Sequence, residues 1–210
     1  MFLKNSKINF HLIFITDDSP ITKLKGTIEQ SCKAGVKAIQ LRQKTLTTNE
    51  ILQTARIIKE ITTEFNSQLL INDRLDIALL SKADGLHSPE NGIMPSQSKK
   101  FNSQLICGKS VHSVRNAKIA EKQGYDYIIY GPVFKTPSKI KYGKPQGLEA
   151  LKRVCKSVDI PVFAVGGITA LRAKKCISSG AFGVAVISAI MCSNNVKNIV
   201  TEFDNALGGL

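Results

Sequence analysis

Two apolar stretches decide the fold of this chain: Ile160-Pro-Val-Phe-Ala-Val-Gly-Gly-Ile168 and Gly180-Ala-Phe-Gly-Val-Ala-Val-Ile-Ser188. Each stretch is rich in β-branched residues, has the length of a strand buried on both faces, and ends in small residues. The segment between them, from Thr169 to Ser179, spaces its apolar residues for one face of a helix. The whole region therefore predicts two consecutive parallel strands joined by a helix.

The turns that follow these two strands predict a phosphate site. Gly166 and Gly167 allow a tight turn with uncovered amide groups, and Ile187 and Ser188 open the next helix. Two sets of N–H groups can then converge on one anion. A pair of glycines alone would only indicate the end of a strand, but the paired turns favour binding.

Strands and helices are expected to alternate along the whole sequence. We expect further strands at 10–16, 36–41, 68–71, 83–87, 105–108 and 125–130, and further helices at 24–34, 48–64, 76–81, 114–123, 148–157 and 195–206. The sixth strand is expected to lead into a long loop, 131–147. Eight strands with helical connections and no segment left over predict an α/β fold, a single-domain (β/α)8 TIM barrel formed by residues 1–210.

Composition limits the classes of function. The net charge of +13 is spread along the chain, with no basic block rich in aromatic residues, so we expect no nucleic-acid partner. No apolar run approaches the ~18 residues of a membrane span, and we expect a cytoplasmic protein without a membrane partner. The five cysteines are scattered without a Cys-x-x-Cys pair, which indicates reduced thiols.

Polar residues gather where the expected strands end, and in such barrels the active site forms at the carboxyl ends of the strands. His112 is the candidate acid–base residue, because an exposed imidazole can both accept and donate a proton near neutral pH. His87 is expected to be a structural histidine. Several candidate substrate-binding residues also have a structural alternative: Arg42 as a surface cation, Asn72 as a helix cap, and Ser138 with Lys139 as an ordinary polar loop. The candidate substrate-binding residues are Arg42, Lys44, Asn72, Ser110, Thr136, Ser138 and Lys139. Asp17 is expected at the end of the first strand, and Asp73 beside Asn72 at the end of the third.

Seven ordered motifs resemble the thiamine phosphate synthase and TenI superfamily. They are Gln40-Leu-Arg-Gln-Lys44, Asn72-Asp-Arg-Leu-Asp-Ile-Ala78, Ala83-Asp-Gly-Leu-His87, Gly108-Lys-Ser-Val-His112, Gly131-Pro-Val-Phe-Lys-Thr136, Val165-Gly-Gly-Ile168 and Gly183-Val-Ala-Val-Ile-Ser-Ala-Ile190. The resemblance runs from about Leu12 to the end of the sequence. It implies a (β/α)8 barrel and a role in thiamine biosynthesis.

The resemblance leaves two branches open. Thiamine phosphate synthases join a pyrimidine methyl diphosphate to a thiazole phosphate, with Mg²⁺ held by an Asp that matches Asp73 and by a second Asp in a His-x-Gly-Gln-x-Asp pattern. Here that pattern reads His87-Ser-Pro-Glu-Asn-Gly92, so glycine stands at the second Asp, and Glu90 lies two positions earlier. Losing one carboxylate weakens the expectation of a diphosphate-bound cation.

These departures favour the TenI branch, whose members are thiazole tautomerases, isomerases that need no metal. By resemblance, His112 moves the proton, Gly167 and Ser188 hold the phosphate of a small phosphorylated thiazole, and Arg42, Lys44 and Ser138 contact or orient the substrate. The synthase, a transferase using Mg²⁺ at Asp73, is the alternative, and a catalytically silent phosphate-binding protein is a third possibility. Barrels of this kind commonly associate, so a homo-oligomer is left open.

Overall fold

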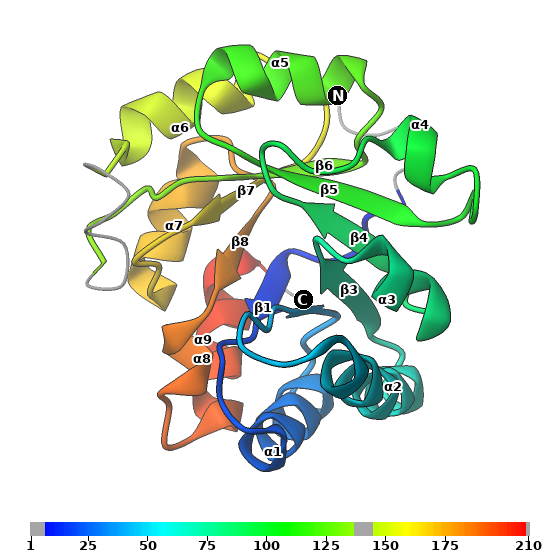
Figure 1. Cartoon of the computed structure of the whole chain (residues 1–210). Coiled ribbons are helices and arrows are strands. Elements are labelled where there is room, and N and C mark those ends of the chain that lie inside the picture. The colour runs from blue at the N-terminus through cyan, green and yellow to red at the C-terminus, as the bar shows by residue number, and fades with distance from the viewer. Residues whose placement is uncertain (1–6, 137–144, 209–210) are drawn as a thin grey trace.

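The computed structural model describes residues 7–136 and 145–208, and within them the chain forms a closed parallel barrel. The eight strands follow one another around the barrel in sequence order, from β1 to β8, and β8 pairs with β1. Helices surround the strands on the outside (Figure 1). The predicted (β/α)8 TIM-barrel fold is confirmed.

The strands are short. They are β1 (Leu12–Ile15), β2 (Ala38–Leu41), β3 (Gln68–Asn72), β4 (Gly85–Ser88), β5 (Ile106–Val111), β6 (Tyr127–Tyr130), β7 (Val162–Val165) and β8 (Gly183–Val186). Helices of very different length connect them. They are α1 (Ile21–Lys33), α2 (Thr48–Glu64), α3 (Leu75–Leu80), α4 (Pro95–Ser98), α5 (Val114–Lys122), α6 (Gly147–Cys155), α7 (Ala170–Ser178), α8 (Ser188–Met191) and α9 (Val196–Leu207).

Helix α2 shows how local sequence sets an element. Thr47 and Glu50 form a capping box at its start, in which each side chain bonds the other residue's backbone N–H. Ile51, Ala55 and Ile58 recur along one side and are buried against the sheet. Because both signals are local, the predicted bounds of this helix, 48–64, match the structure.

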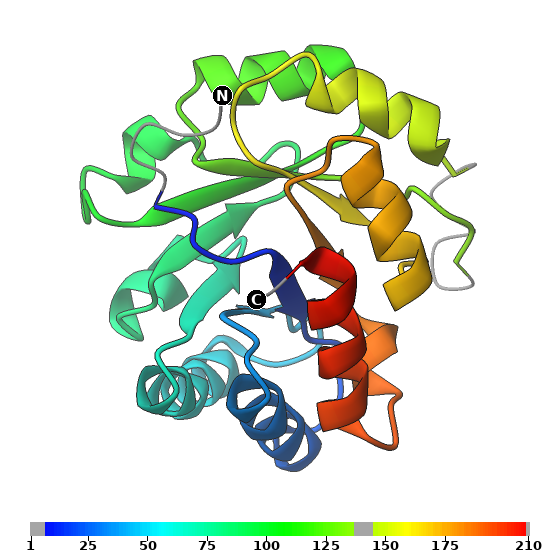
Figure 2. The ribbon, with the colours of Figure 1, turned by 180° about the vertical axis from the view of Figure 1, so that it is seen from behind.

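The barrel has two apolar layers, one between strands and helices and one inside the barrel. Inside, Phe10 packs 5.6 Å from the ring centroid of Phe163 and 6.2 Å from that of Tyr127. Phe10 precedes β1, on a segment that crosses the back of the barrel in Figure 2. The apolar run predicted as a strand at 10–16 is thus a shorter strand preceded by a residue that fills the barrel core.

Strand β5 corrects a second expectation. The sequence predicted a strand at 105–108, but β5 continues through Lys109 and Ser110 to Val111. Alternation along the strand turns Lys109 outward, where its ammonium lies 5.0 Å from the centroid of the Tyr125 ring, and turns Ser110 to the cavity. Two polar residues therefore interrupt the apolar pattern without ending the strand.

Two short helices, α4 and α8, complete the described connections, and α4 was not predicted. Four residues are too few to show a helical period. Within the described residues, no helix combines the length and the apolar character needed to cross a membrane.

Candidate active site

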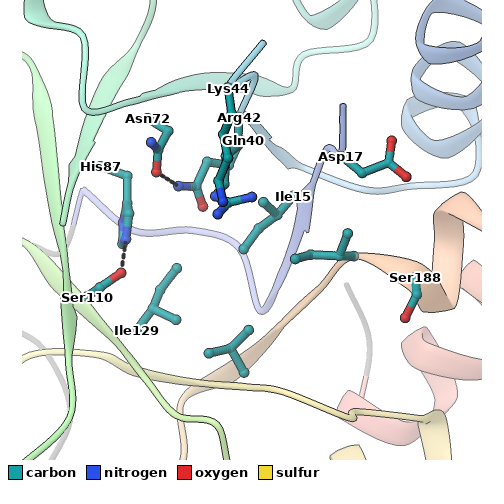
Figure 3. Close-up of a pocket in the computed structure, with 12 residues that line it drawn as sticks. Ile15, Asp17, Gln40, Arg42, Lys44, Asn72, His87, Ser110, Ile129 and Ser188 are labelled. Carbon is teal, nitrogen blue, oxygen red and sulfur yellow. Dashed lines mark hydrogen bonds between the residues drawn. The ribbon is translucent and has the colours of Figure 1, made fainter. Parts of the chain in front are cut away.

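One inward side chain from each strand or from its carboxyl end forms the floor of a cavity of about 370 Å³ (Figure 3). In order from β1 to β8 these residues are Ile15, Gln40, Asn72, His87, Ser110, Ile129, Val165 and Ile187. This layer lies directly above the aromatic core, because successive inward residues on a strand are two positions apart. The cavity therefore opens at the carboxyl ends of the strands, as the sequence predicted.

The floor is divided into two halves of different chemistry. The residues from β2 to β5 are polar, and those from β6, β7, β8 and β1 are aliphatic. Figure 3 shows hydrogen bonds within the polar half, from Gln40 to Asn72 and between His87 and Ser110. A flat ligand with one polar edge and one apolar edge would match both halves.

Gln40 was quoted in a motif but was not predicted as a site residue. Its Nε2 donates to Asn72 Oδ1 at 3.2 Å, while its Oε1 is buried without a hydrogen-bond partner among the described residues. An unpaired buried acceptor is costly. Gln40 lines the cavity, and a ligand that donated a hydrogen bond to this oxygen would remove the cost. Its apolar neighbours in the sequence gave no signal of that role.

His87 is held in a neutral state by its surroundings. Burial, together with the positive charge of Arg42, lowers the pKa of His87 from 6.5 to about 3. Its Nε2 lies 2.9 Å from Ser110 Oγ and its Nδ1 lies 3.1 Å from the Tyr127 hydroxyl. Both ring nitrogens thus have partners, and the imidazole also forms part of the cavity floor.

His112 follows directly after β5, and its side chain is exposed. Its Nδ1 lies 2.6 Å from the carbonyl oxygen of Gly131, which can only accept, so Nδ1 carries the proton. In the neutral ring Nε2 is then the nitrogen that can take a proton. His112 lines a second, larger cavity of about 740 Å³ rather than the floor around His87.

The two cavities meet at four shared residues. Arg42, Lys44, Asn72 and Ser110 line both of them. The loop that carries the two cations is tied to the loop after β1, because Arg42 N donates to Thr16 Oγ1 at 2.9 Å and Lys44 N donates to Asp18 Oδ1 at 2.7 Å. Because the side chains of Arg42 and Lys44 line the junction, it is cationic and suits a ligand with a phosphate group.

The predicted phosphate-binding residues lie together. Gly166, Gly167, Ile187 and Ser188 line one small pocket with Thr136. Both glycines have positive φ, and a Cβ on Gly166 would lie 2.6 Å from Pro132 Cβ. Arg172, which the sequence did not indicate, supports this turn: its Nη1 donates to Gly167 O at 2.6 Å and its guanidinium lies 4.9 Å from the centroid of the Phe134 ring.

The structure therefore brings together most of the predicted residues in three neighbouring pockets. Asp17 lines the smaller cavity, on the opposite side from His87 and Ser110 in Figure 3. Asp73 lines the larger one. Ser138 and Lys139 lie outside the described residues.

The five cysteines are all free. Burial raises the pKa of Cys32 and Cys155 to about 11 and that of Cys176 to about 12. Thiols with such values are poor nucleophiles at neutral pH.

Comparison with known proteins supplies the family. A family model described as thiamine monophosphate synthase matches residues 12–190. The chain belongs to the thiamine monophosphate synthase family. The matched range begins at β1 and ends within α8, so it covers the whole barrel.

Relatives within this family are similar over most of their length. The chain is 44% identical over 165 residues to a putative thiamine-phosphate synthase 2 of Aquifex aeolicus, covering 79% of this chain and 88% of that protein. It is 37% identical over 193 residues to a thiamine-phosphate synthase of Clostridium novyi, covering 90% and 95%. The solved structure of a thiamine phosphate pyrophosphorylase from Pyrococcus furiosus is 32% identical, with a TM-score of 0.85 and coverage of 95% and 96%.

These findings confirm the family that the motifs indicated. The two sequence relatives are named as thiamine-phosphate synthases, which matches the alternative reading of the sequence better than the tautomerase reading. Assignment to the TenI branch stays a prediction.

The family implies Mg²⁺, and the acidic residues of the larger cavity allow a test of the fit. Asp73 and Glu90 both line this cavity, which suits a cation that takes one or two carboxylates and completes its shell with phosphate oxygens and water. Gly92 has no side chain to supply a third, and a Cβ there would lie 2.7 Å from Pro89 Cδ and 2.8 Å from Ser88 Cβ. The described residues contain no group of three or more His, Cys, Asp and Glu side chains suited to a metal. The fit therefore depends on a ligand that brings its own phosphate oxygens.

Proposed function

We propose that this chain is an enzyme of thiamine biosynthesis that catalyses the thiamine-phosphate synthase reaction. In this reaction a pyrimidine methyl diphosphate and a thiazole phosphate are joined, and diphosphate is released. The observation that carries the proposal is the pair of cavities that meet at Arg42 and Lys44, with a separate phosphate pocket at Gly166 and Gly167. Two phosphorylated substrates need two anion sites close to one another.

The roles of the residues follow from their positions. Arg42 and Lys44 would stabilise the diphosphate as the bond to the methylene carbon breaks and the electron pair leaves with the phosphate oxygen. Gln40 Oε1 would accept a hydrogen bond from the polar edge of a substrate ring, whose apolar edge would lie over Ile129, Val165 and the other aliphatic floor residues. The Gly166 turn would hold the thiazole phosphate beside this ring.

Asp73 and Glu90 are the residues that would hold Mg²⁺, which when bound neutralises charge on a diphosphate. Glu90 is already oriented by Asn116, whose Nδ2 donates to Glu90 Oε1.

The tautomerase remains a second candidate because of two observations. The family's second acidic position is Gly92, in a loop too tight for a side chain, and His112 has its Nδ1 held by a carbonyl so that Nε2 can act as a base. In that reaction one imidazole would remove a ring proton and return a proton to the exocyclic carbon.

One set of assays separates the two reactions. The wild type, Asp73→Asn and His112→Asn are compared for formation of thiamine phosphate and diphosphate, with and without Mg²⁺, and for aromatisation of the carboxythiazole phosphate tautomer. The synthase proposal expects Mg²⁺-dependent coupling that Asp73→Asn reduces at least ~100-fold. The matched control for His112 is His11→Asn, since His11 lies at the other end of the barrel, 2.7 Å from Phe182 O. Aromatisation without coupling, lost only in His112→Asn, would establish the tautomerase, and activity in neither assay would leave a phosphate-binding protein.

A further inference from the structure

A line of three hydrogen-bonded side chains leads from the apolar barrel core to the cavity. The Tyr127 hydroxyl lies 3.1 Å from His87 Nδ1, and His87 Nε2 lies 2.9 Å from Ser110 Oγ. Tyr127 is fully buried, His87 is 2% exposed, and Ser110 lines both cavities. Figure 3 shows the end of this line at which His87 meets Ser110.

The surroundings hold the Tyr127 phenol in place. Its ring is packed edge-on at 6.2 Å from Phe10 and 5.5 Å from Phe163, measured between centroids. It also lies against Gly108, where a Cβ would be 2.0 Å from Tyr127 Cζ. Glycine at 108 thus makes room for the phenol, and the hydroxyl is aimed at His87.

The direction of the hydrogen bonds follows from the number of donors. The Tyr127 hydroxyl makes no other hydrogen bond to a described residue, so it leaves a buried donor unpaired unless it donates to His87 Nδ1. A neutral imidazole has one N–H, and with Nδ1 acting as acceptor that proton is on Nε2. Nε2–H then donates to Ser110 Oγ, and the serine's own O–H is free to point into the cavity.

We propose that Tyr127 is a positioning residue that fixes His87 in its Nε2–H tautomer and thereby makes Ser110 a hydrogen-bond donor to an anionic oxygen of the ligand. The opposite tautomer would direct the Ser110 proton to His87 and present only lone pairs to the cavity. Arg42 and Lys44 line the same two cavities as Ser110, and a phosphate or diphosphate oxygen is expected near these cations. The inference deepens the proposed function and rests on it for the identity of the ligand, but the tautomer can be measured without turnover.

The first test measures the tautomer in the free protein. Nitrogen-15 NMR of protein labelled at its three histidines distinguishes a protonated ring nitrogen from an unprotonated one, and loss of a signal in His87→Gln assigns the residue. We expect His87 in the wild type to have Nε2 protonated and Nδ1 unprotonated at pH 7 to 8. In Tyr127→Phe the Nδ1–H form should become populated, because neither tautomer then has a partner at Nδ1.

Tyr125→Phe is the matched control. It removes the hydroxyl of a tyrosine two residues away, which donates to Ile93 O at 2.9 Å and does not contact His87. This variant should keep the wild-type tautomer. A wild-type ring with Nδ1 protonated, or a tautomer that is the same in Tyr127→Phe, would overturn the proposal.

The second test asks whether Tyr127 acts through Ser110. Binding of inorganic diphosphate is measured by calorimetry for the wild type, Tyr127→Phe, Ser110→Ala and the double variant. Tyr127→Phe should weaken binding about 5-fold, the effect of about one neutral hydrogen bond, and should have no further effect when Ser110 is already alanine. A loss of affinity of equal size in both backgrounds would show that Tyr127 does not act through Ser110, and would overturn the proposal.

The two tests also separate this inference from the proposed function. If the wild type makes no thiamine phosphate but shows the expected tautomer and the coupled loss of diphosphate binding, the proposed reaction fails and the role of Tyr127 stands. If the wild type makes thiamine phosphate but its His87 is protonated at Nδ1, the role of Tyr127 fails and the proposed reaction stands.

Discussion

Replacing His87 should change how the stability of the protein depends on pH. The pKa of this imidazole is about 3 in the folded protein, against 6.5 as a reference, because burial excludes the charged form. Between these values the unfolded chain binds a proton that the folded chain cannot bind. Stability is therefore unaffected by this group above about pH 7 and falls as pH decreases through 6.5.

The size of the effect follows from the shift. A pH of 5 is 1.5 units below the reference pKa of 6.5, at which the histidine of the unfolded chain takes up its proton. This difference corresponds to a loss of about 2 kcal/mol in the free energy of unfolding. His87→Gln removes the titrating group, so the difference between wild type and variant should change by about 2 kcal/mol between pH 8 and pH 5. Taking the difference cancels the carboxylates common to both proteins.

The assay is urea unfolding at matched ionic strength, followed by far-ultraviolet circular dichroism because the chain has no tryptophan. His112→Gln, which removes an exposed imidazole, is the control. A difference between wild type and His87→Gln that stays constant within about 0.5 kcal/mol from pH 8 to pH 5 would refute the argument that burial keeps His87 neutral.

Three further changes test the barrel core and the phosphate turn. Phe163→Ala should lower the free energy of unfolding by about 3–5 kcal/mol, because this ring is fully buried inside the barrel. The control, Leu171→Ala, changes a side chain that is 70% exposed and should alter the free energy of unfolding by less than about 0.5 kcal/mol. Urea unfolding measures both, and equal losses would contradict the assignment of the core. Gly166→Ala should weaken binding of inorganic phosphate at least ~10-fold in calorimetry, since φ is 100° and a Cβ would meet Pro132 at 2.6 Å, and unchanged affinity would exclude this turn as the anion site. Arg172→Gln removes the bond to Gly167 O and the contact with the Phe134 ring, and should weaken phosphate binding about 5-fold; stronger binding in the variant would show that Arg172 holds the turn in an unfavourable form.

Local sequence signals predicted the elements whose stability is itself local. Helix α2 has a capping box and a regular apolar face, and its bounds were predicted correctly. The apolar β-branched runs predicted β7 and β8, because strands buried on both faces have almost no polar residues. Strand ends were predicted wrongly where tertiary contacts decide them. Phe10 was placed in the first strand, but it precedes β1 and packs inside the barrel. Lys109 and Ser110 were left out of the fifth strand because they are polar, but both belong to β5.

The position of the candidate site was predictable for a similar reason. In a parallel barrel every strand ends at the same side, so residues such as Arg42, Asn72 and His112 were expected to lie near one another. The structure assigns these residues to two cavities. Asn72 and Arg42 line both cavities, whereas His112 lines only the larger one. Strand order alone does not say which side chains of neighbouring strand ends share a cavity.

The sequence by itself determined the alternation of strands and helices, the barrel that this alternation implies, and the family to which the motifs belong. Only the tertiary structure decided the division of the cavity floor into polar and aliphatic halves, the unpaired oxygen of Gln40 and the line from Tyr127 to Ser110. The reason is physical. Secondary structure depends on residues a few positions apart, but Tyr127 and His87 are 40 positions apart and meet only after the barrel closes and its register places their side chains in adjacent layers.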